Sequence, residues 1–168
     1  MRNHQESIWM LQTKRADFNA VAAQFHISPV TARIIRNRDV EGEEAIDRYL
    51  NGTLDQLYDP HLMKDMDKAA SLILEKIRAG VRIRIVGDYD IDGVCSTYLL
   101  YRGLSRCGGH VDYQIPERIR DGYGINESII RKAKEDGIDT IVTCDNGIAA
   151  LEQVRLAKEL GMTVIVTD

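Results

Sequence analysis

Three aspartates lie within five positions of the chain, at Asp88, Asp90 and Asp92, and a glycine stands on each side of the group. Carboxylates held this close repel one another, so such a cluster is costly unless a cation lies among them. Carboxylate oxygens are the ligands that hard divalent cations prefer. The cluster therefore predicts a metal site, and two-metal sites of this kind support hydrolysis of phosphate esters.

Two further aspartates follow predicted strands later in the chain. From residue 81 onward, short β-branched runs alternate with amphipathic helices, which predicts parallel strands joined by crossover helices and hence an open α/β sheet. The expected strands are 81–86, 110–115, 139–144 and 162–167. Asp145 follows the third strand and Asp168 the fourth. Because loops after parallel strands converge on one crevice, we expect all five aspartates to share a site.

Two interpretations without catalysis fit these residues less well. Aspartate is a common turn and cap residue, but five of them after three strands make that explanation insufficient. The spacing D-x-D-x-D-G also matches the start of a calcium-binding EF-hand loop. Leu99 stands where that loop requires a bidentate Glu, and a predicted strand precedes the aspartates where the motif needs a helix.

A phosphatase interpretation stays open on the residues alone. In "DIDGV", Asp90 would attack phosphorus and Asp92 would act as acid and base, as in haloacid-dehalogenase-type phosphatases. The strand before the motif fits that family. No clear Ser/Thr and Lys partner set follows, and Asp88 and the later "DNGI" stay unexplained.

Residues 1–80 are predicted to form a helical N-terminal region, and residues 81–168 to form part of an α/β domain. Within the first region, "VAAQFHISPVTARIIRNR" fits a helix-turn-helix in which Thr31, Arg33 and Arg36 face a DNA groove. A plain helical pair is the favoured interpretation, because short-turn helix pairs are common and the local positive charge is small.

The composition is that of a globular protein. Of the 168 residues, 44% are hydrophobic and 29% are charged, and the net charge of −4 gives no overall attraction to nucleic acid. No apolar run is long enough to cross a bilayer, and the N-terminus lacks the apolar core of a secretion signal. Three cysteines without a CxxC spacing favour reduced thiols, so we expect a cytoplasmic protein.

Several motifs together resemble the DHH phosphoesterase superfamily, and more narrowly its RecJ-type single-stranded-DNA-specific exonucleases. They are "IIRNRDVEGEEAIDRYL", "LYDPHLMKDMDKA", "IRIVGDYDIDGVCST", "IPERIRDGYGIN", "CDNGI" and the final "VTD". The resemblance implies metal-dependent hydrolysis of single-stranded DNA with 5′-to-3′ polarity. It also implies two Mn²⁺ ions, whereas a carboxylate-rich site by itself would equally suit Mg²⁺. Paired ions in such sites lie about 3.5 to 4 Å apart.

The resemblance also assigns roles to individual residues. Asp90 and Asp92 match metal ligands of the first motif, and Asp145 matches the ligand of the second motif that bridges two ions. These three and Asp168, which matches the opening residue of the third motif, form the expected catalytic set. Asp88 and Asp168 are further candidate ligands. The expected substrate-binding residues are Arg118, Arg120 and Asn146.

Two departures from the family pattern affect these expectations. Val86 stands where related inorganic pyrophosphatases carry a metal-binding histidine. The chain also stops at Asp168, before the two histidines of the third motif. We therefore expect an N-terminal fragment of an exonuclease that has little or no activity by itself. Single-stranded DNA is the expected partner, and no membrane association is expected.

Overall fold

The computed structural model describes residues 10, 14–119 and 122–168, and the chain divides into two compact units after Asp59. The first unit contains three short helices, α1 (Phe18–Phe25), α2 (Pro29–Asn37) and α3 (Glu43–Asn51). A 3₁₀ turn, η1 (Leu54–Gln56), follows them. Among the described residues, no helix combines the length and the apolar character needed to cross a membrane.

Side-chain caps set where the first two helices begin. Asp17 accepts hydrogen bonds from the backbone N–H groups of the first turn of α1, and Ser28 accepts one from Thr31 at the start of α2. Each of the three helices buries apolar side chains on one side. They are Ala22 on α1, Ala32 and Ile35 on α2, and Ile46 on α3.

The side chains that a helix-turn-helix would present to DNA have partners inside this unit. The Arg33 guanidinium lies 4.3 Å from the centre of the Phe18 ring, and Arg36 pairs with Glu41 at 3.0 Å. The Thr31 hydroxyl contacts the side chain that caps its helix, 2.9 Å away. These contacts favour the plain helical pair over the DNA-reading module.

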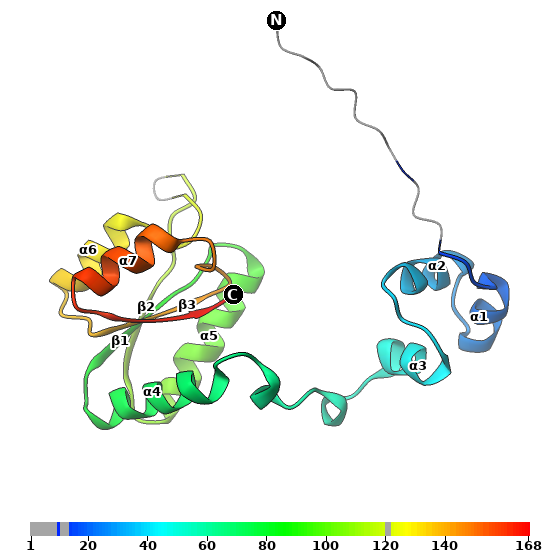
Figure 1. Ribbon diagram of the computed structural model, residues 1–168, viewed down its shortest axis with the longest axis horizontal. Coiled ribbons are helices and arrows are strands. Elements are labelled where there is room, and N and C mark those ends of the chain that lie inside the picture. The colour runs from blue at the N-terminus through cyan, green and yellow to red at the C-terminus, as the bar shows by residue number, and fades with distance from the viewer. Residues whose placement is uncertain (1–9, 11–13, 120–121) are drawn as a thin grey trace, which may run out of the picture. The chain divides into compact units, whose positions relative to one another are not determined.

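The second unit, Pro60–Asp168, is an open sheet of four parallel strands with helices on both faces (Figure 1). The strands lie in the order β2 (His110–Gln114), β1 (Arg82–Val86), β3 (Thr140–Cys144) and β4 (Thr163–Thr167). Helices α6 (Glu127–Glu135) and α7 (Leu151–Glu159) cover one face, and α4 (Met66–Arg78) and α5 (Ile91–Arg106) cover the other. The predicted fold class is confirmed.

A separate short turn precedes helix α4. The chain makes a separate 3₁₀ turn, η2 (Pro60–Leu62), and α4 begins only at Met66, because Asp65 takes a left-handed backbone conformation with φ of 58°. Its apolar side then packs against the sheet through Leu72, Ile73 and Ile77. The compact units divide after Asp59, so α4 belongs to the second unit. The sequence analysis placed the domain boundary at residue 80.

The strand order creates a switch point at the centre of the sheet. The chain leaves β1 toward β2 on one side, and β3 returns to the other side of β1. The loops after β1 and β3 therefore lead to helices on opposite faces of the sheet, and both loops lie at its carboxyl edge. This is the edge at which the sequence predicts the aspartates to meet.

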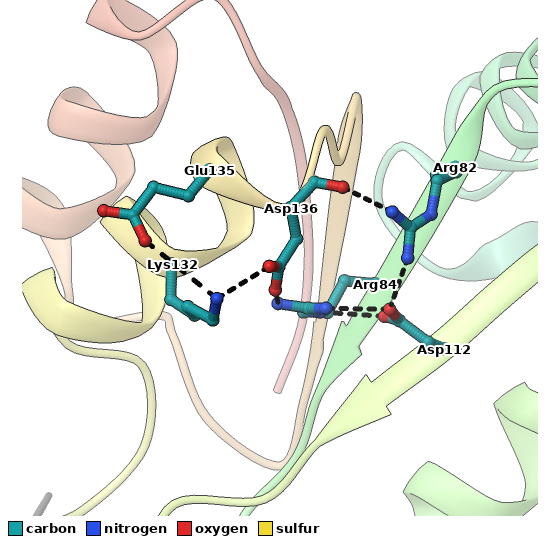
Figure 2. Close-up of polar contacts among 6 residues, drawn as sticks. All are labelled: Arg82, Arg84, Asp112, Lys132, Glu135 and Asp136. Atoms are coloured by element: carbon teal, nitrogen blue, oxygen red, sulfur yellow. Dashed lines mark hydrogen bonds and ion pairs between the residues drawn. The ribbon is translucent and has the colours of Figure 1, made fainter.

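A buried arginine ties three elements of this unit together (Figure 2). Arg84, in the middle of β1, is 8% exposed and donates two hydrogen bonds of 2.8 Å to the two carboxylate oxygens of Asp112 on β2. A third nitrogen donates to Asp136 at the end of α6, 2.9 Å away. Lys132 pairs with the other oxygen of Asp136, at 2.8 Å. The network joins the edge strand and α6 to the strand that leads to the aspartates.

Replacing Arg84 with Met should destabilise the second unit by about 2 kcal/mol. Loss of one partner of a fully buried ion pair costs more than this. Here Asp112 and Asp136 keep roughly a third and a quarter of their side-chain surface in water, so water can still solvate them when Arg84 is absent. Urea denaturation measures the change. Arg131→Met removes an exposed pair with Glu127 on α6 and should cost less than about 0.5 kcal/mol. Equal losses in the two variants would contradict the role given to Arg84.

Candidate metal centre

Asp88 lies two residues after the end of β1, at the carboxyl edge of the sheet, and is almost completely buried. Its side chain is 1% exposed, and one carboxylate oxygen, Oδ1, accepts a long hydrogen bond of 3.4 Å from the backbone N–H of Gly124. The other oxygen, Oδ2, is buried and has no hydrogen-bond partner among the described residues. A buried anionic oxygen without a donor is costly, and a cation is the partner that best removes this cost.

Asp90 caps the helix that follows. Its Oδ1 accepts hydrogen bonds of 3.0 Å from the backbone N–H groups of Asp92 and Gly93, so the cap fixes the first turn of α5. The positive end of the helix dipole therefore points toward the acidic cluster. Asp92 lies in this first turn, and its side chain is exposed.

Asp145 follows β3 in a left-handed backbone conformation, with φ of 58°. Its backbone N–H donates to the carbonyl of Thr167 on β4, 3.0 Å away, which holds the turn at the edge of the sheet. Desolvation raises the pKa of the Asp145 carboxyl, and the neighbouring charge and hydrogen bond of Asp90 raise it further. Asp92 and Asp88 add smaller contributions of the same sign. Asp145 therefore lies within electrostatic reach of all three aspartates that follow β1.

Tyr123 and Asp168 complete the same edge. The Tyr123 hydroxyl donates to the backbone carbonyl of Asp145 at 2.9 Å, and Asp168 Oδ2 accepts from the backbone N–H of Ile148 at 2.8 Å. Partial desolvation and four carboxylate charges raise the pKa of the Tyr123 hydroxyl. These charges belong, in decreasing order, to Asp88, Asp145, Asp168 and Asp90. The structure thus brings the five predicted aspartates to one edge of the sheet.

Arg118 lies at the rim of the cluster. Its guanidinium stacks 5.4 Å from the centre of the Tyr89 ring, and that ring meets Tyr123 edge-to-face with centroids 6.4 Å apart. Arg120, the other predicted substrate contact in this loop, lies outside the described residues. The sequence analysis gave no role to Tyr89, although its position between Asp88 and Asp90 is itself a signal that its ring borders the site.

Asn146 points inward. Its side chain is 1% exposed, and its amide nitrogen donates to the backbone carbonyls of Val86 and Cys144 at 3.0 and 2.9 Å. Its amide oxygen accepts from the backbone N–H of Ile125 at 3.0 Å. These three hydrogen bonds engage both ends of the amide, and the predicted substrate contact of Asn146 stays a prediction. The side chain joins the ends of β1 and β3 to the loop that carries Arg118.

Gly93 allows α5 to pack directly on the backbone of the first motif. A Cβ atom at this position would lie 2.5 Å from the carbonyl oxygen of Asp88 and 2.7 Å from its Cα. The space beside Gly93 is thus occupied by the backbone of Asp88. Any side chain here would displace a residue of the acidic cluster.

Gly93→Ala should therefore destabilise the protein by about 2 kcal/mol, the usual cost of overpacking a closely packed contact. Gly103, on the same helix, has nothing within 4 Å of its missing Cβ. Gly103→Ala should stabilise the helix by about 0.5 to 1 kcal/mol. Thermal unfolding measures the stability of the two variants. If both substitutions stabilised the protein, or both destabilised it, close packing against Asp88 would not account for the effect at Gly93.

The donor set fits a hard divalent cation. It consists of carboxylate oxygens from three loops, one of them buried and unpartnered, with a helix N-terminus nearby. Within the described part of the chain, no three acidic, histidine or cysteine side chains meet at the spacing of a closed coordination shell. Like charges keep carboxylates apart, so closing the shell requires side-chain rotations toward the cation.

Residues 82–168 match the DHH family, N-terminal domain. The match begins at β1 and includes all four strands and every aspartate of the cluster. The chain belongs to the DHH family. Membership in this family favours the metal-centre interpretation of "DIDGV" over the phosphatase alternative, which would make Asp90 a nucleophile.

Curated relatives extend the similarity through the helical region. The chain is 39% identical over 161 residues to the single-stranded-DNA-specific exonuclease RecJ of Bacillus subtilis, a match that covers 95% of this chain. It is 32% identical over 160 residues to the RecJ exonuclease of Escherichia coli. The chain spans 20% of the length of the Bacillus subtilis protein and 27% of the length of the Escherichia coli protein.

Two solved structures share the fold. A crystal structure of exonuclease RecJ bound to manganese superposes with a TM-score of 0.62 at 38% identity, covering 67% of this chain and 29% of that one. RecJ of Thermus thermophilus in complex with Mn²⁺ gives a TM-score of 0.60 at 31% identity and covers 90% of this DHH-family chain and 20% of the other. Both neighbours hold the cation that the donor set of this chain would suit.

Proposed function

We propose that this DHH-family chain supplies the divalent-metal site of an exonuclease that hydrolyses phosphodiester bonds in single-stranded DNA. The observation that carries the proposal is the buried, unpartnered Oδ2 of Asp88 at the edge where Asp90, Asp92 and Asp145 converge. Similarity to RecJ exonucleases supports the substrate class, and two RecJ structures with manganese support the choice of Mn²⁺, with Mg²⁺ as the chemically similar alternative. The 5′-to-3′ polarity is part of the same proposal.

Asp90, Asp92 and Asp145 are the proposed metal ligands, and Asp88 and Asp168 supply further oxygens. When bound, divalent ions activate water and neutralise the charge of the phosphate. The raised pKa of Asp145 affects metal binding, because the carboxyl holds its proton to higher pH than an ordinary aspartate does. A cation competes with that proton. As the pH falls, metal binding at Asp145 should therefore weaken at a higher pH than at a carboxyl with the usual pKa of 3.8.

The other residues of the edge position the DNA and the loops. Arg118 is available at the rim to donate hydrogen bonds to a phosphate, and Tyr89 holds its guanidinium in place by stacking. Tyr123 fastens the loop of Arg118 to the Asp145 turn through its hydroxyl. Asp90 orients the N-terminus of α5, whose dipole favours a phosphate beside the cluster.

A cytoplasmic location remains part of the proposal. Cys95, Cys107 and Cys144 are all free thiols, and two of them are exposed. Exposed free thiols are best suited to a reducing compartment. Single-stranded DNA is the proposed partner, and the proposal involves no protein partner.

Titration of the 168-residue chain with Mn²⁺ tests the ligand assignment. Isothermal calorimetry at pH 7 should show binding that Asp92→Asn and Asp145→Asn each weaken by about tenfold or more, since each removes an anionic ligand. Asp47→Asn is the matched control, because Asp47 is an exposed carboxylate on α3 in the other unit. Equal Mn²⁺ affinity in all four proteins would refute the assignment.

Replacing the matching fifth of the Bacillus subtilis exonuclease with this chain tests the activity. The chimaera should degrade a labelled single-stranded oligonucleotide in Mn²⁺ and leave a blunt duplex largely intact. Asp92→Asn in the chimaera should slow cleavage by about a hundredfold or more, the scale on which lost transition-state stabilisation acts. Cleavage at an unchanged rate would show that Asp92 has no part in the reaction.

A further inference from the structure

The side of α5 that faces away from the sheet is exposed and partly aromatic. The helix packs inward through Thr97, Leu100 and Leu104. The opposite side carries Ile91, which is 75% exposed, and Tyr98, which is 59% exposed. We call the set Ile91, Tyr98, Arg102 and Arg106 the α5 outer face. These positions are seven, four and four residues apart and so form one stripe along the helix.

The α5 outer face is positively charged on an acidic protein. Residues 93–111 contain no Asp or Glu, whereas Arg102 and Arg106 lie among them and the chain as a whole carries a net charge of −4. Within the described part of the chain, no carboxylate pairs with either guanidinium, although Arg131 and Arg155 on the opposite face of the sheet each pair with a glutamate of their own helix. The local charge suits an anionic partner.

Aromatic rings alternate with these cations. The Arg102 guanidinium lies 5.9 Å from the centre of the Tyr98 ring. Beside the helix, Tyr101 meets Tyr113 of edge strand β2 edge-to-face with centroids 5.5 Å apart, and Tyr113 is 57% exposed. Exposed rings next to arginines are the combination with which proteins bind single-stranded nucleic acid, because bases stack on the rings and phosphates contact the cations.

The stripe begins at the proposed metal centre. Ile91 directly follows Asp90, the residue that caps α5, and it adjoins Asp92. At 1.5 Å per residue, the helix carries the stripe about 15 Å from Asp92 to Arg102. A strand whose end lies at the aspartates can therefore continue along the α5 outer face without leaving this unit.

We propose that the α5 outer face, together with Tyr113, is a second contact surface for the single-stranded DNA whose end occupies the metal centre. This inference rests on the proposed function for its substrate class. Tyr98 and Tyr113 stack on bases, and Arg102 and Arg106 contact phosphates. The surface selects single strands, because the bases of a duplex are not free to stack on a protein ring.

Fluorescence anisotropy of a labelled oligothymidylate with the 168-residue chain, in EDTA, tests this surface separately from the metal. Tyr98→Ala should weaken binding about tenfold, the scale of one lost base stack. Arg102→Ala combined with Arg106→Ala should lower the slope of log affinity against log salt by about 1.4, the value for two lost phosphate contacts on a single strand. All replaced side chains are exposed, and circular dichroism checks that the variants fold.

Two matched controls lie outside the α5 outer face. Tyr58→Ala removes a ring that is 82% exposed, and Arg131→Ala removes a cation on α6; both should bind the oligonucleotide like the parent chain. Failure of the parent chain to bind, or equal weakening by the control and α5 variants, would overturn the inference. It would also be overturned if gel filtration showed that the α5 variants abolish self-association, since the surface would then be a contact between copies.

Mn²⁺ titration of the same variants separates this inference from the proposed function. The Tyr98 and Arg102/Arg106 variants should bind Mn²⁺ with parent affinity. Parent-like DNA binding by the α5 variants with normal Mn²⁺ binding would remove the second surface and leave the metal centre in place. Loss of Mn²⁺ affinity in the α5 variants would instead show that the changes had disturbed the centre, and would contradict a separate contact surface.

Discussion

The structure depends on one electrostatic constraint, which is that several carboxylates must stay close together at the carboxyl edge of a parallel sheet. Asp88 carries part of this cost, because one of its oxygens is buried without a donor among the described residues. The raised pKa of Asp145 has the same origin, since desolvation and neighbouring negative charges both penalise its ionised form. A divalent cation would remove both costs at once, and this is the basis of the proposed phosphodiester chemistry.

The rest of the fold holds this arrangement in place against the repulsion. Because β1 and β3 are parallel neighbours, their loops lie at the same edge of the sheet. The Arg84 network fastens β2 and α6 to β1 from within the sheet, and Asn146 joins the loops by three hydrogen bonds. Close packing at Gly93 fixes the start of α5 against Asp88. Rigid surroundings of this kind let carboxylates remain near one another before a cation arrives.

Much of this was readable from the sequence because the relevant patterns are local. Alternating β-branched runs and amphipathic helices predicted the parallel sheet, and the position of each aspartate after a strand predicted that they would meet. What could not be predicted depends on long-range packing. The inward orientation of Asn146 and the three-way pairing of Arg84 join segments far apart in the chain, and no spacing rule reports such contacts. The start of α4 at Met66 follows a left-handed backbone conformation at Asp65, which the neighbouring residue types do not indicate.

Anomalous diffraction from crystals of this chain grown with Mn²⁺ would test the central claim most directly. The account predicts manganese density at the carboxyl edge of the sheet, within direct coordination distance of oxygens from Asp90, Asp92 and Asp145. It also predicts that the buried oxygen of Asp88 will gain the cation as its partner, either directly or through an ordered water. Manganese found only at other surface carboxylates, with this edge unchanged, would contradict the claim that the cluster is a metal centre.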